Sequence, residues 1–539
     1  MLAPLEKGWA LAVPPPPPPR FPTGIYAIVR VDKVANAPAA TTACPNVKHI
    51  DKYLNCYYLA LLGNPAVAGL ALQIHWDTLN PAEPAYAGDP NAYNWHNLQY
   101  AFDSVDTWNT ANPSLPKTIQ LLVSPGFFTP GWVMKNLDSC DGLFDSSQPT
   151  ATSDCGKVTF KGFTECGDDV GCNTTTKYPA CSNCYELPMP WNNDYQDAWT
   201  GFLQALNAQY GSKSSLVSIA VAGPTASSVE MILPNDNNSN VPDGFNVLPA
   251  STPDNMWLGL LKHKNKGTAP PYPDDTFVDE WNKAIDTYAS VFSGLTLVVT
   301  TGSGLPDLAV SPETSSSTSL VTAECSKSMT NDCVAEATIL YHFAGSGVGG
   351  YNGKATQSSG VEASRLPDGN LGLDGVKSLT QSTMSMFSPS TLILGGAQFN
   401  KPFSDSAADT QAEGCFKGLS SILCSSLTAE QAAYDALDVF FLGTQGVNPL
   451  TGETWSFSAT LGSAPLNYLQ IYDDDINYAT GTTSTQSVVP YSFDGSDFAT
   501  ASLGPTFSAS AQTLLDAVRD QLSSIAKAEP ICPLGTTCR

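Results

Sequence analysis

Short apolar runs alternate with amphipathic segments along the chain from about residue 24 onward. The runs are mostly continuous, which is typical of parallel strands that are buried on both faces. The eight predicted strands are residues 24–34, 68–76, 118–124, 216–222, 295–301, 347–351, 391–396 and 466–472. Helical spacing of apolar residues occurs between and after them, at Leu98, Ala101, Phe102, Val105 and Trp108, at Tyr434, Leu437, Phe440 and Phe441, and at Leu514, Leu515, Val518, Leu522 and Ile525. Eight strand–helix repeats predict an α/β fold of the (β/α)8, or TIM-barrel, class rather than a doubly wound sheet.

Three regions depart from this repeat. Residues 1–23 contain an unbroken proline run, so we expect a stiff N-terminal tail that acts as a spacer or docks a surface partner or a second copy. A cysteine-rich stretch at about residues 136–190 interrupts the third strand–helix connection and predicts a disulfide-stapled insertion beside the site. We therefore expect the barrel to occupy residues 24–529 and a disulfide-closed tail to occupy residues 530–539.

The charge balance excludes several partners. The chain has 25 Lys+Arg against 50 Asp+Glu, a formal net charge of −25, which argues against nucleic acid and anionic membranes. Charged residues make up only 14% of the chain, well below the usual figure of about 25%. We therefore expect a globular protein with a surface of mainly uncharged polar groups.

The cysteines indicate an oxidising compartment. There are 14, and several form close sequence pairs: Cys44 with Cys56, Cys325 with Cys333, Cys415 with Cys424, and Cys532 with Cys538. The six in the cysteine-rich stretch have no neighbouring histidine, so disulfides are favoured over a metal site there. Two N-x-S/T sequons, at Asn173 and Asn237, suit a secreted glycoprotein. Taken together, these features predict a secreted, extracellular protein without a metal or cofactor.

The N-terminus carries Glu6 and Lys7 where a secretion signal would have its apolar core, so either the signal has been removed or export uses another route. The sequence has no apolar run of about 18 residues, so we expect no membrane-spanning helix.

Aromatic, carboxylate and amide residues gather at the predicted strand ends, where barrel enzymes place their chemistry. The second strand ends in His75, Trp76 and Asp77, the third leads to Phe127, Phe128 and Trp132, the fourth to Glu230, and the eighth to Tyr472 and Asp473. A sugar ring offers a C–H face for stacking and hydroxyl groups for hydrogen bonds. The pattern therefore predicts a carbohydrate as the partner.

The region from residue 24 to about 235 resembles the clan A glycoside hydrolases, the superfamily of β-galactosidase-like and cellulase-like (β/α)8 barrels. The resemblance rests on an aromatic strand end at Trp76, a Leu-x-Pro at residues 79–81, a Tyr-x-Trp at residues 93–95, and a Pro-x-Trp at residues 130–132. Pro190 and Trp191 extend it. The chain is thus similar to a divergent member of that group.

The resemblance implies an acid/base glutamate after the fourth strand, and Glu230 matches that place, although Val229 precedes it where the family has Asn. The family nucleophile is a glutamate at the end of the seventh strand, where this chain has Gln398. An amide is a poor nucleophile, so another group must act if the chain is active. The candidates for the second carboxylate are Asp473, Asp474 or Asp475, Asp77, and Glu413 from a neighbouring loop.

Simpler interpretations apply to the same residues. Glu230 is also consistent with a surface carboxylate, residues 473–475 with a turn or a weak calcium site, and His75 with a hydrogen-bonding residue at a strand end. Trp76, Phe127, Phe128 and Trp132 equally suit core packing. If the site is real, the expected substrate contacts are His75, Trp76, Phe127, Trp132, Gln398 and Tyr472.

Two functions follow. The first is a secreted glycoside hydrolase-like protein that cleaves a glycosidic bond through paired carboxylates, with Glu230 as proton donor. The second is a non-catalytic barrel, carbohydrate-binding or structural, that has lost the nucleophile at Gln398.

Overall fold

The parallel strands of the protein form a closed ring. The computed structural model describes residues 21–36, 50–146, 148–161, 184–238, 252–311, 325, 330–345, 354–361, 393–399, 443–447, 454–458, 466–473, 476, 515–516, 518–520 and 522. The ring strands are β1 (Gly24–Arg30), β2 (Val67–His75), β3 (Thr118–Ser124), β6 (Leu216–Ala220), β8 (Thr296–Gly304), β9 (Lys354–Val361), β10 (Ile393–Phe399) and β13 (Leu466–Tyr472). Each pairs in parallel with the next, β13 pairs with β1, and β6 pairs directly with β8. The predicted (β/α)8 class is therefore confirmed.

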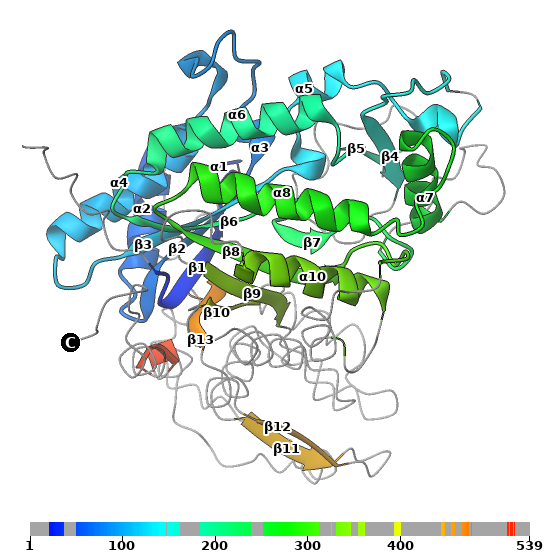
Figure 1. The fold of residues 1–539 in the computed structure, drawn as a ribbon. Helices are drawn as coiled ribbons and strands as arrows, with labels where there is room; N and C mark the ends of the chain where they lie inside the picture. Colours follow the sequence, from blue (N-terminus) through cyan, green and yellow to red (C-terminus); the bar gives the residue numbers. More distant parts are fainter. Residues whose placement is uncertain are drawn as a thin grey trace, which may run out of the picture.

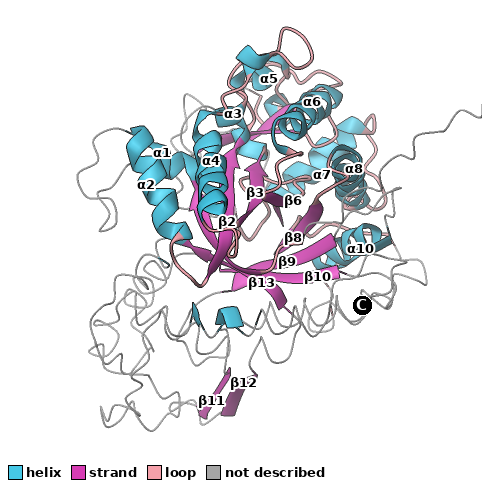
Figure 2. Cartoon of the chain, turned by 90° about the vertical axis from the view of Figure 1, so that its left-hand side faces the viewer, coloured by secondary structure: helices cyan, strands magenta, loops and turns pink. Residues whose placement is uncertain are grey.

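Helices lie on the outside of this ring (Figures 1 and 2). They are α1 (Val31–Asn36), α2 (Ile50–Leu62), α3 (Trp76–Leu79), α4 (His96–Ala111), α5 (Gly131–Asn136), α6 (Asn193–Tyr210), α7 (Pro253–Lys264), α8 (Asp275–Val291) and α10 (Asn331–Gly345). The helix predicted from Leu98 onward is α4, and four of its five predicted apolar residues are buried. Leu515, Val518 and Leu522 are also helical and buried, while residues 434–441 lie outside the described residues.

The sixth strand of the ring is β9, residues 354–361, which the sequence did not predict. The predicted Gly-rich run at 347–351 lies outside the described residues. β9 has the sequence KATQSSGV and fills the ring position between β8 and β10. Its polar and β-branched residues carry no continuous apolar signal, so a search for apolar runs passes over it.

Hydrogen bonds and register identify the side chains that face the interior of the barrel. Gln470 on β13 donates to Gln120 on β3 over 2.5 Å. Since β1 and β2 separate these two strands in the ring, both side chains must cross the interior. Tyr26 shares a register level with Gln470 and bonds to Thr118 at 2.7 Å. Side chains in register along parallel strands point to the same side, so alternate residues on every ring strand can be assigned inward or outward.

The bottom of the interior is filled by two tyrosines and the space left by glycine. Burial raises the pKa of Tyr26 to about 12, and its ring meets that of Tyr468 edge-on at 6.2 Å. A Cβ atom on Gly69 would lie 2.0 Å from the Thr118 carbonyl oxygen and 2.9 Å from the Tyr26 ring. Gly69 thus makes room for the Tyr26–Thr118 contact.

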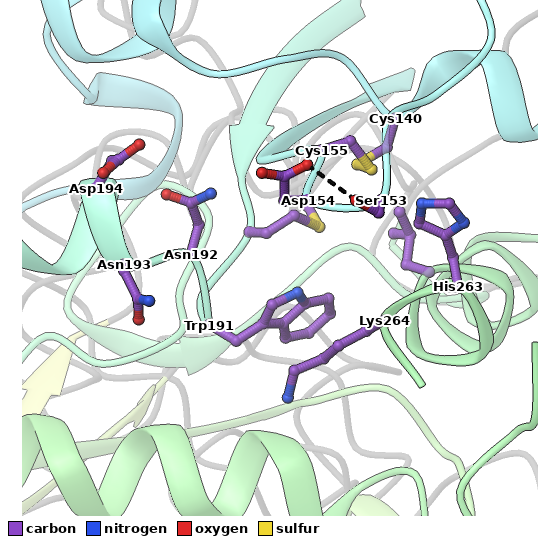
Figure 3. A pocket seen from close by; sticks show the side chains of 12 residues that line it. Cys140, Ser153, Asp154, Cys155, Trp191, Asn192, Asn193, Asp194, His263 and Lys264 are labelled. Atoms are coloured by element: carbon purple, nitrogen blue, oxygen red, sulfur yellow. Dashed lines mark hydrogen bonds between the residues drawn. A yellow bond between two sulfur atoms is a disulfide. The ribbon is translucent and has the colours of Figure 1, made fainter. Parts of the chain in front are cut away.

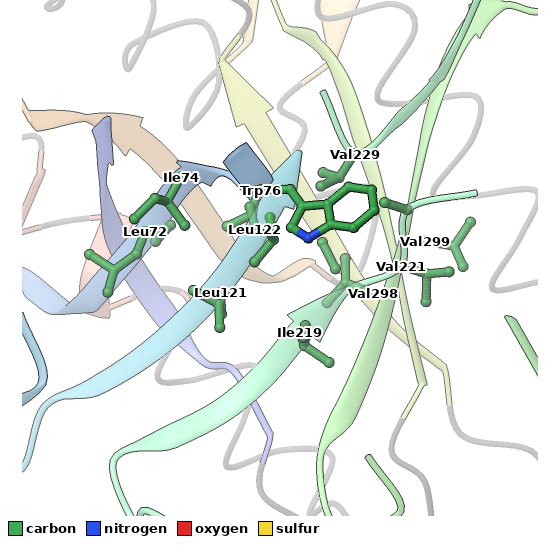
Figure 4. Close-up of a cluster of buried hydrophobic side chains, with 14 of the residues drawn as sticks. Leu72, Ile74, Trp76, Leu121, Leu122, Ile219, Val221, Val229, Val298 and Val299 are labelled. Atoms are coloured by element: carbon green, nitrogen blue, oxygen red, sulfur yellow. The ribbon is translucent and has the colours of Figure 1, made fainter. Parts of the chain in front are cut away.

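The outward side chains of the strands pack beneath the helices. Leu72 and Ile74 on β2, Leu121 on β3, Ile219 on β6 and Val299 on β8 are fully buried there (Figure 4). These alternate with the inward residues along each strand, so both faces of the sheet are covered, as expected for parallel strands.

The cysteine-rich insertion contributes an antiparallel hairpin, β4 (Lys157–Lys161) with β5 (Cys184–Pro188). A disulfide joins Cys140 to Cys155 within it, and a second joins Cys325 to Cys333 as predicted. Cys56 is also disulfide-bonded, whereas Cys44, Cys415, Cys424, Cys532 and Cys538 lie outside the described residues. A second hairpin pairs β11 (Gly443–Val447) with β12 (Thr454–Ser458).

None of the helices in the described ranges is long and apolar enough to cross a membrane. Most of the predicted N-terminal tail and all of the C-terminal tail lie outside those ranges, so the domain boundaries stay predictions.

Candidate active site at the barrel mouth

The carboxyl ends of the ring strands meet at one end of the barrel. Inward-facing residues at this end include Arg30 on β1, His75 on β2, Ser124 on β3, Thr300 on β8 and Tyr472 on β13. The loops and short helices that follow these strands surround the opening. We call this region the mouth.

Glu230 faces the mouth. After β6 the chain runs through a loop and returns as β7 (Glu230–Ile232), which takes the place of β6 beside the end of β8. Val221 donates from its backbone N–H to the Val298 carbonyl at 2.8 Å and so guides the chain along β8. Glu230 is in register with Thr300, whose side chain is fully buried on the inner side. The half-buried Glu230 carboxyl therefore points inward at the height where barrel enzymes act.

The loop that carries Glu230 is held by the loop after β3. Phe127 donates its backbone N–H to the Ala226 carbonyl at 2.7 Å. Gly126 has a φ of +66°, and a Cβ atom there would lie 2.1 Å from that same carbonyl oxygen. Only glycine allows this close approach. The third and fourth strand ends are thereby joined, which fixes the path that leads to Glu230.

His75 is bound from two sides. Its Nδ1 lies 3.3 Å from Oδ2 of Asp32, and its backbone N–H donates to the same oxygen at 3.0 Å. The imidazole stacks flat on Phe128, with ring centres 3.6 Å apart and planes 2° apart. These contacts orient the imidazole at the mouth. Asp32 was not predicted as a site residue, because the predicted first strand, residues 24–34, included it.

Arg30 and Tyr472 form the neighbouring part of the mouth. The guanidinium carbon lies 5.5 Å from the centre of the Tyr472 ring, within the range of a cation–π contact. Tyr472 is nearly buried, so the contact holds its ring against the first strand. The predicted placement of Tyr472 at the mouth agrees with this geometry.

Two of the candidates for the second carboxylate, Asp473 and Asp77, lie in different surroundings. Asp473 follows Tyr472, so alternation turns it outward, and it accepts a hydrogen bond from the Tyr57 hydroxyl on the outer helix α2. Asp77 lies half-buried in the short helix α3, directly after the His75 strand end. Asp473 is thus directed away from the barrel interior, and Asp77 follows the mouth residue His75 by two positions, while Asp474, Asp475 and Glu413 lie outside the described residues.

Gln398 occupies the interior of the seventh strand, as predicted. It is in register with Gln470 and 3% exposed, so it belongs to the same interior level as the Gln470–Gln120 bond. The barrel interior therefore contains three amide side chains, those of Gln398, Gln470 and Gln120.

Two predicted substrate contacts lie in the packing. Trp76 is fully buried and touches Trp199 of α6 at 4.8 Å between ring centres, because alternation along β2 turns it outward. Phe127 is buried against Tyr185 at 5.2 Å. Neither offers a face to a substrate in this structure. Trp132 is half-buried, and its indole N–H donates to the Asn80 carbonyl at 3.0 Å, which ties α5 to the end of α3.

Among the described residues, no group of three or more His, Cys, Asp or Glu side chains is arranged to hold a metal ion.

No protein-family model and no curated protein sequence matches the chain. Solved structures that match include the catalytic domain of beta-amylase from Paenibacillus polymyxa, at 8% identity over 84% of this chain and 93% of that one, with a TM-score of 0.36. A glycoside hydrolase family 5 mannosidase from Rhizomucor miehei matches at 12% identity over 95% of each chain, with a TM-score of 0.32. Endo-glycoceramidase II from Rhodococcus sp. matches at 12% identity over 70% of this chain and 73% of that one, with a TM-score of 0.27. Similarity at this level assigns no reaction, and the (β/α)8 fold rests on the strand pairing itself.

Proposed function

We propose that this protein is a secreted enzyme that hydrolyses a glycosidic bond at the barrel mouth, with Glu230 as the proton donor. The observation that carries the proposal is that Glu230 on β7 pairs in register with the inward-facing Thr300 on β8. β7 there takes the place of β6, the fourth strand of the ring. The disulfides support secretion, because disulfides persist in oxidising compartments.

The chemistry needs one acid and one base. The Glu230 carboxyl would give its proton to the glycosidic oxygen as the bond to the anomeric carbon breaks, and the sugar on that side leaves as an alcohol. A water molecule would attack the anomeric carbon and lose its proton to a base on the β1–β2 side. The candidate bases are Asp77 and the Asp32–His75 pair; Asp77 and Asp32 follow the ends of the second and first strands.

The amide at Gln398 favours direct attack by water over a covalent intermediate, since the seventh strand has no carboxylate at that level. The product should then have the opposite anomeric configuration to the substrate. Proton NMR of the freshly released sugar reads this configuration directly, and retention would redirect the search to a carboxylate nucleophile.

The first test is the hydrolysis of aryl glycosides and polysaccharides between pH 3 and 8 by wild type and Glu230→Gln. We expect the substitution to lower kcat by about 10²–10⁴-fold, because it removes the proton donor and keeps the side-chain shape. The control is Glu83→Gln, an exposed glutamate of the loop that follows α3, which should retain wild-type activity. Equal activity of wild type and Glu230→Gln would reject the assignment.

The second candidate function is a carbohydrate-binding barrel without catalysis, which the amide at Gln398 favours. In that case no substrate is hydrolysed by wild type, and saccharides bind equally to wild type and Glu230→Gln.

A further inference from the structure

A polar cavity of about 390 Å³ lies between the cysteine-rich insertion and the helices α6 and α7 (Figure 3). Its volume falls in the usual range of small-molecule sites. The insertion contributes Ser153 and Asp154, the start of α6 contributes Trp191 and Asp194, and the end of α7 contributes His263 and Lys264. None of the mouth residues named above lines it.

Trp191 supplies the aromatic surface of the cavity. Its indole is half-buried and braced edge-on by the fully buried Trp257, at 6.3 Å between ring centres. The Lys264 ammonium lies 5.2 Å from the ring centre. In Figure 3 the indole lies between Asp154, above it, and Lys264, below it.

The polar groups carry both signs of charge. Asp154 and Asp194 supply two carboxylates, and Lys264 supplies an ammonium group. The carboxylates would repel an anion, whereas Lys264 would repel a cation. An uncharged ligand with many hydroxyl groups satisfies both kinds of partner, since a hydroxyl donates to a carboxylate and accepts from an ammonium. The C–H face of the same ligand would cover the indole.

The walls of the cavity are fixed by cross-links. The Cys140–Cys155 disulfide closes the loop that carries Ser153 and Asp154. A ring nitrogen of His263 lies 2.6 Å from the carbonyl oxygen of Thr152 and ties this loop to α7. A site held by a disulfide and by the contact between two separate elements is formed before the ligand arrives, which lowers the entropic cost of binding.

We propose that this cavity is a second saccharide-binding site, in which Trp191 stacks on a pyranose ring and Asp154 and Lys264 bind its hydroxyl groups. The protein would then bind a long glycan chain at a site separate from the mouth, in addition to any catalysis there. This second site shares only the substrate class with the proposed function.

The test measures binding of cellohexaose, mannohexaose, xylohexaose and maltohexaose by calorimetry, on the Glu230→Gln background so that no ligand is consumed. Trp191→Ala should weaken binding at this site at least about tenfold, the equivalent of the stacking contribution. Trp191→Phe should restore part of the affinity. Asp154→Asn, an exposed position that cannot disturb the core, should weaken it several-fold.

The matched control is Trp108→Ala, because Trp108 is also a half-buried indole beside a lysine, with Lys117 at 5.5 Å. It should leave hexasaccharide binding unchanged. With Glu230 restored, Trp191→Ala should hydrolyse small aryl glycosides like wild type and show a raised KM for a polysaccharide.

The outcomes separate the two proposals. Trp191-dependent saccharide binding supports the second site even if the mouth proves inactive. The inference is overturned, whether or not the mouth is active, if no hexasaccharide binds in a manner that depends on Trp191 and Asp154. It is also overturned if a cationic ligand, tetralysine, binds there instead.

Discussion

The carboxyl group of Asp274 has a strongly raised pKa. It is 1% exposed, just before α8, and its Oδ2 accepts the backbone N–H of Leu308 at 3.0 Å. Burial is the largest cause of a raised pKa, and together with the negative charges of Asp254, Asp307 and Asp332 it brings the pKa to about 8 against the lowering effect of that hydrogen bond. The folded protein therefore holds a proton on Asp274 at pH values where the unfolded chain has lost it.

This predicts a pH-dependent stability. A carboxyl with a folded pKa above its unfolded value contributes most below about pH 4, and its contribution falls as the pH rises toward 8. Asp274→Asn imitates the protonated form and should be more stable than wild type by about 1–3 kcal/mol at pH 8, with a smaller difference at pH 5. Urea unfolding at both pH values measures this.

The control for that prediction is Asp275→Asn, because Asp275 also accepts one backbone N–H, from Ser311 at 3.0 Å, but is only half-buried. It should show no such gain. A difference between wild type and Asp274→Asn that does not depend on pH would contradict the titration.

Gly69 is a second position where a single atom, the Cβ that glycine lacks, affects the stability of the barrel. Its missing Cβ leaves room for the Tyr26 ring and the Thr118 carbonyl, so Gly69→Ala should destabilise the barrel by about 3 kcal/mol through overpacking. Thermal or urea unfolding measures the loss. Gly131→Ala provides the comparison, because a Cβ there meets nothing within 4 Å, and it should be neutral or slightly stabilising.

At this scale the sequence predicted where several residues of the candidate site lie. The position of Glu230 followed from counting strands, and Tyr472 and His75 from the ends of apolar runs. Trp76 and Phe127 were misjudged as ligand contacts, because an aromatic residue at a strand end faces either the mouth or the helices, and a one-residue step decides which. Asp32 was missed because its role depends on contact with His75, 43 residues away in the chain.

At the scale of elements, the conformation of the loop closed by the Cys140–Cys155 disulfide should depend on that bond. The two cysteines are 15 residues apart, so the bond restricts the unfolded loop by about 3 kcal/mol in the chain-entropy description. The double variant Cys140→Ser/Cys155→Ser should show faster hydrogen exchange at residues 138–157 and weaker hexasaccharide binding.

The Cys325→Ser/Cys333→Ser double variant is the control, because that disulfide ends at Cys333 within α10 and lines no part of the cavity. It should alter exchange near α10 and leave saccharide binding unchanged. Equal binding by both double variants would show that the disulfide does not shape the cavity.

Elements with a continuous apolar signal were the ones that could be predicted. β2, β3 and β13 match their predicted ranges within one residue at each end. β9 was not predicted because its residues are mostly polar, and β7 was not foreseen because three residues carry no periodic pattern. Both owe their position to pairing with β8, a contact between distant parts of the chain.

At the scale of the whole molecule, the order of strands and the net charge are properties of the entire sequence. Eight repeats were enough to predict the barrel, since parallel strands joined by helices close most simply in chain order. The net charge of −25 has a separate effect, because unbalanced negative charges repel one another more strongly in the compact state.

We therefore expect the melting temperature at pH 7 to rise by a few degrees when NaCl increases from about 10 mM to 150 mM, as the Debye length falls from about 30 Å to 8 Å. Calorimetry at both salt concentrations measures this. Near the sequence pI of 4.3 the same change should have little effect. A decrease in melting temperature at pH 7 would mean that favourable ion pairs outweigh the repulsion.

Because β7 replaces β6 beside β8, the side chain that faces the mouth depends on whether the β6–β7 loop changes in length by an odd or an even number of residues. Side chains alternate with every residue along a strand, so removing one residue from the loop between β6 and β7 would bring Val229 or Met231 to the level of Thr300 with Glu230 turned outward. Removing two would turn the carboxylate inward again, about one side-chain pair lower on β8. An insertion or deletion of an even number of residues in this loop therefore shifts the Glu230 carboxylate along β8 and keeps it facing inward. An odd number turns it outward, away from the mouth.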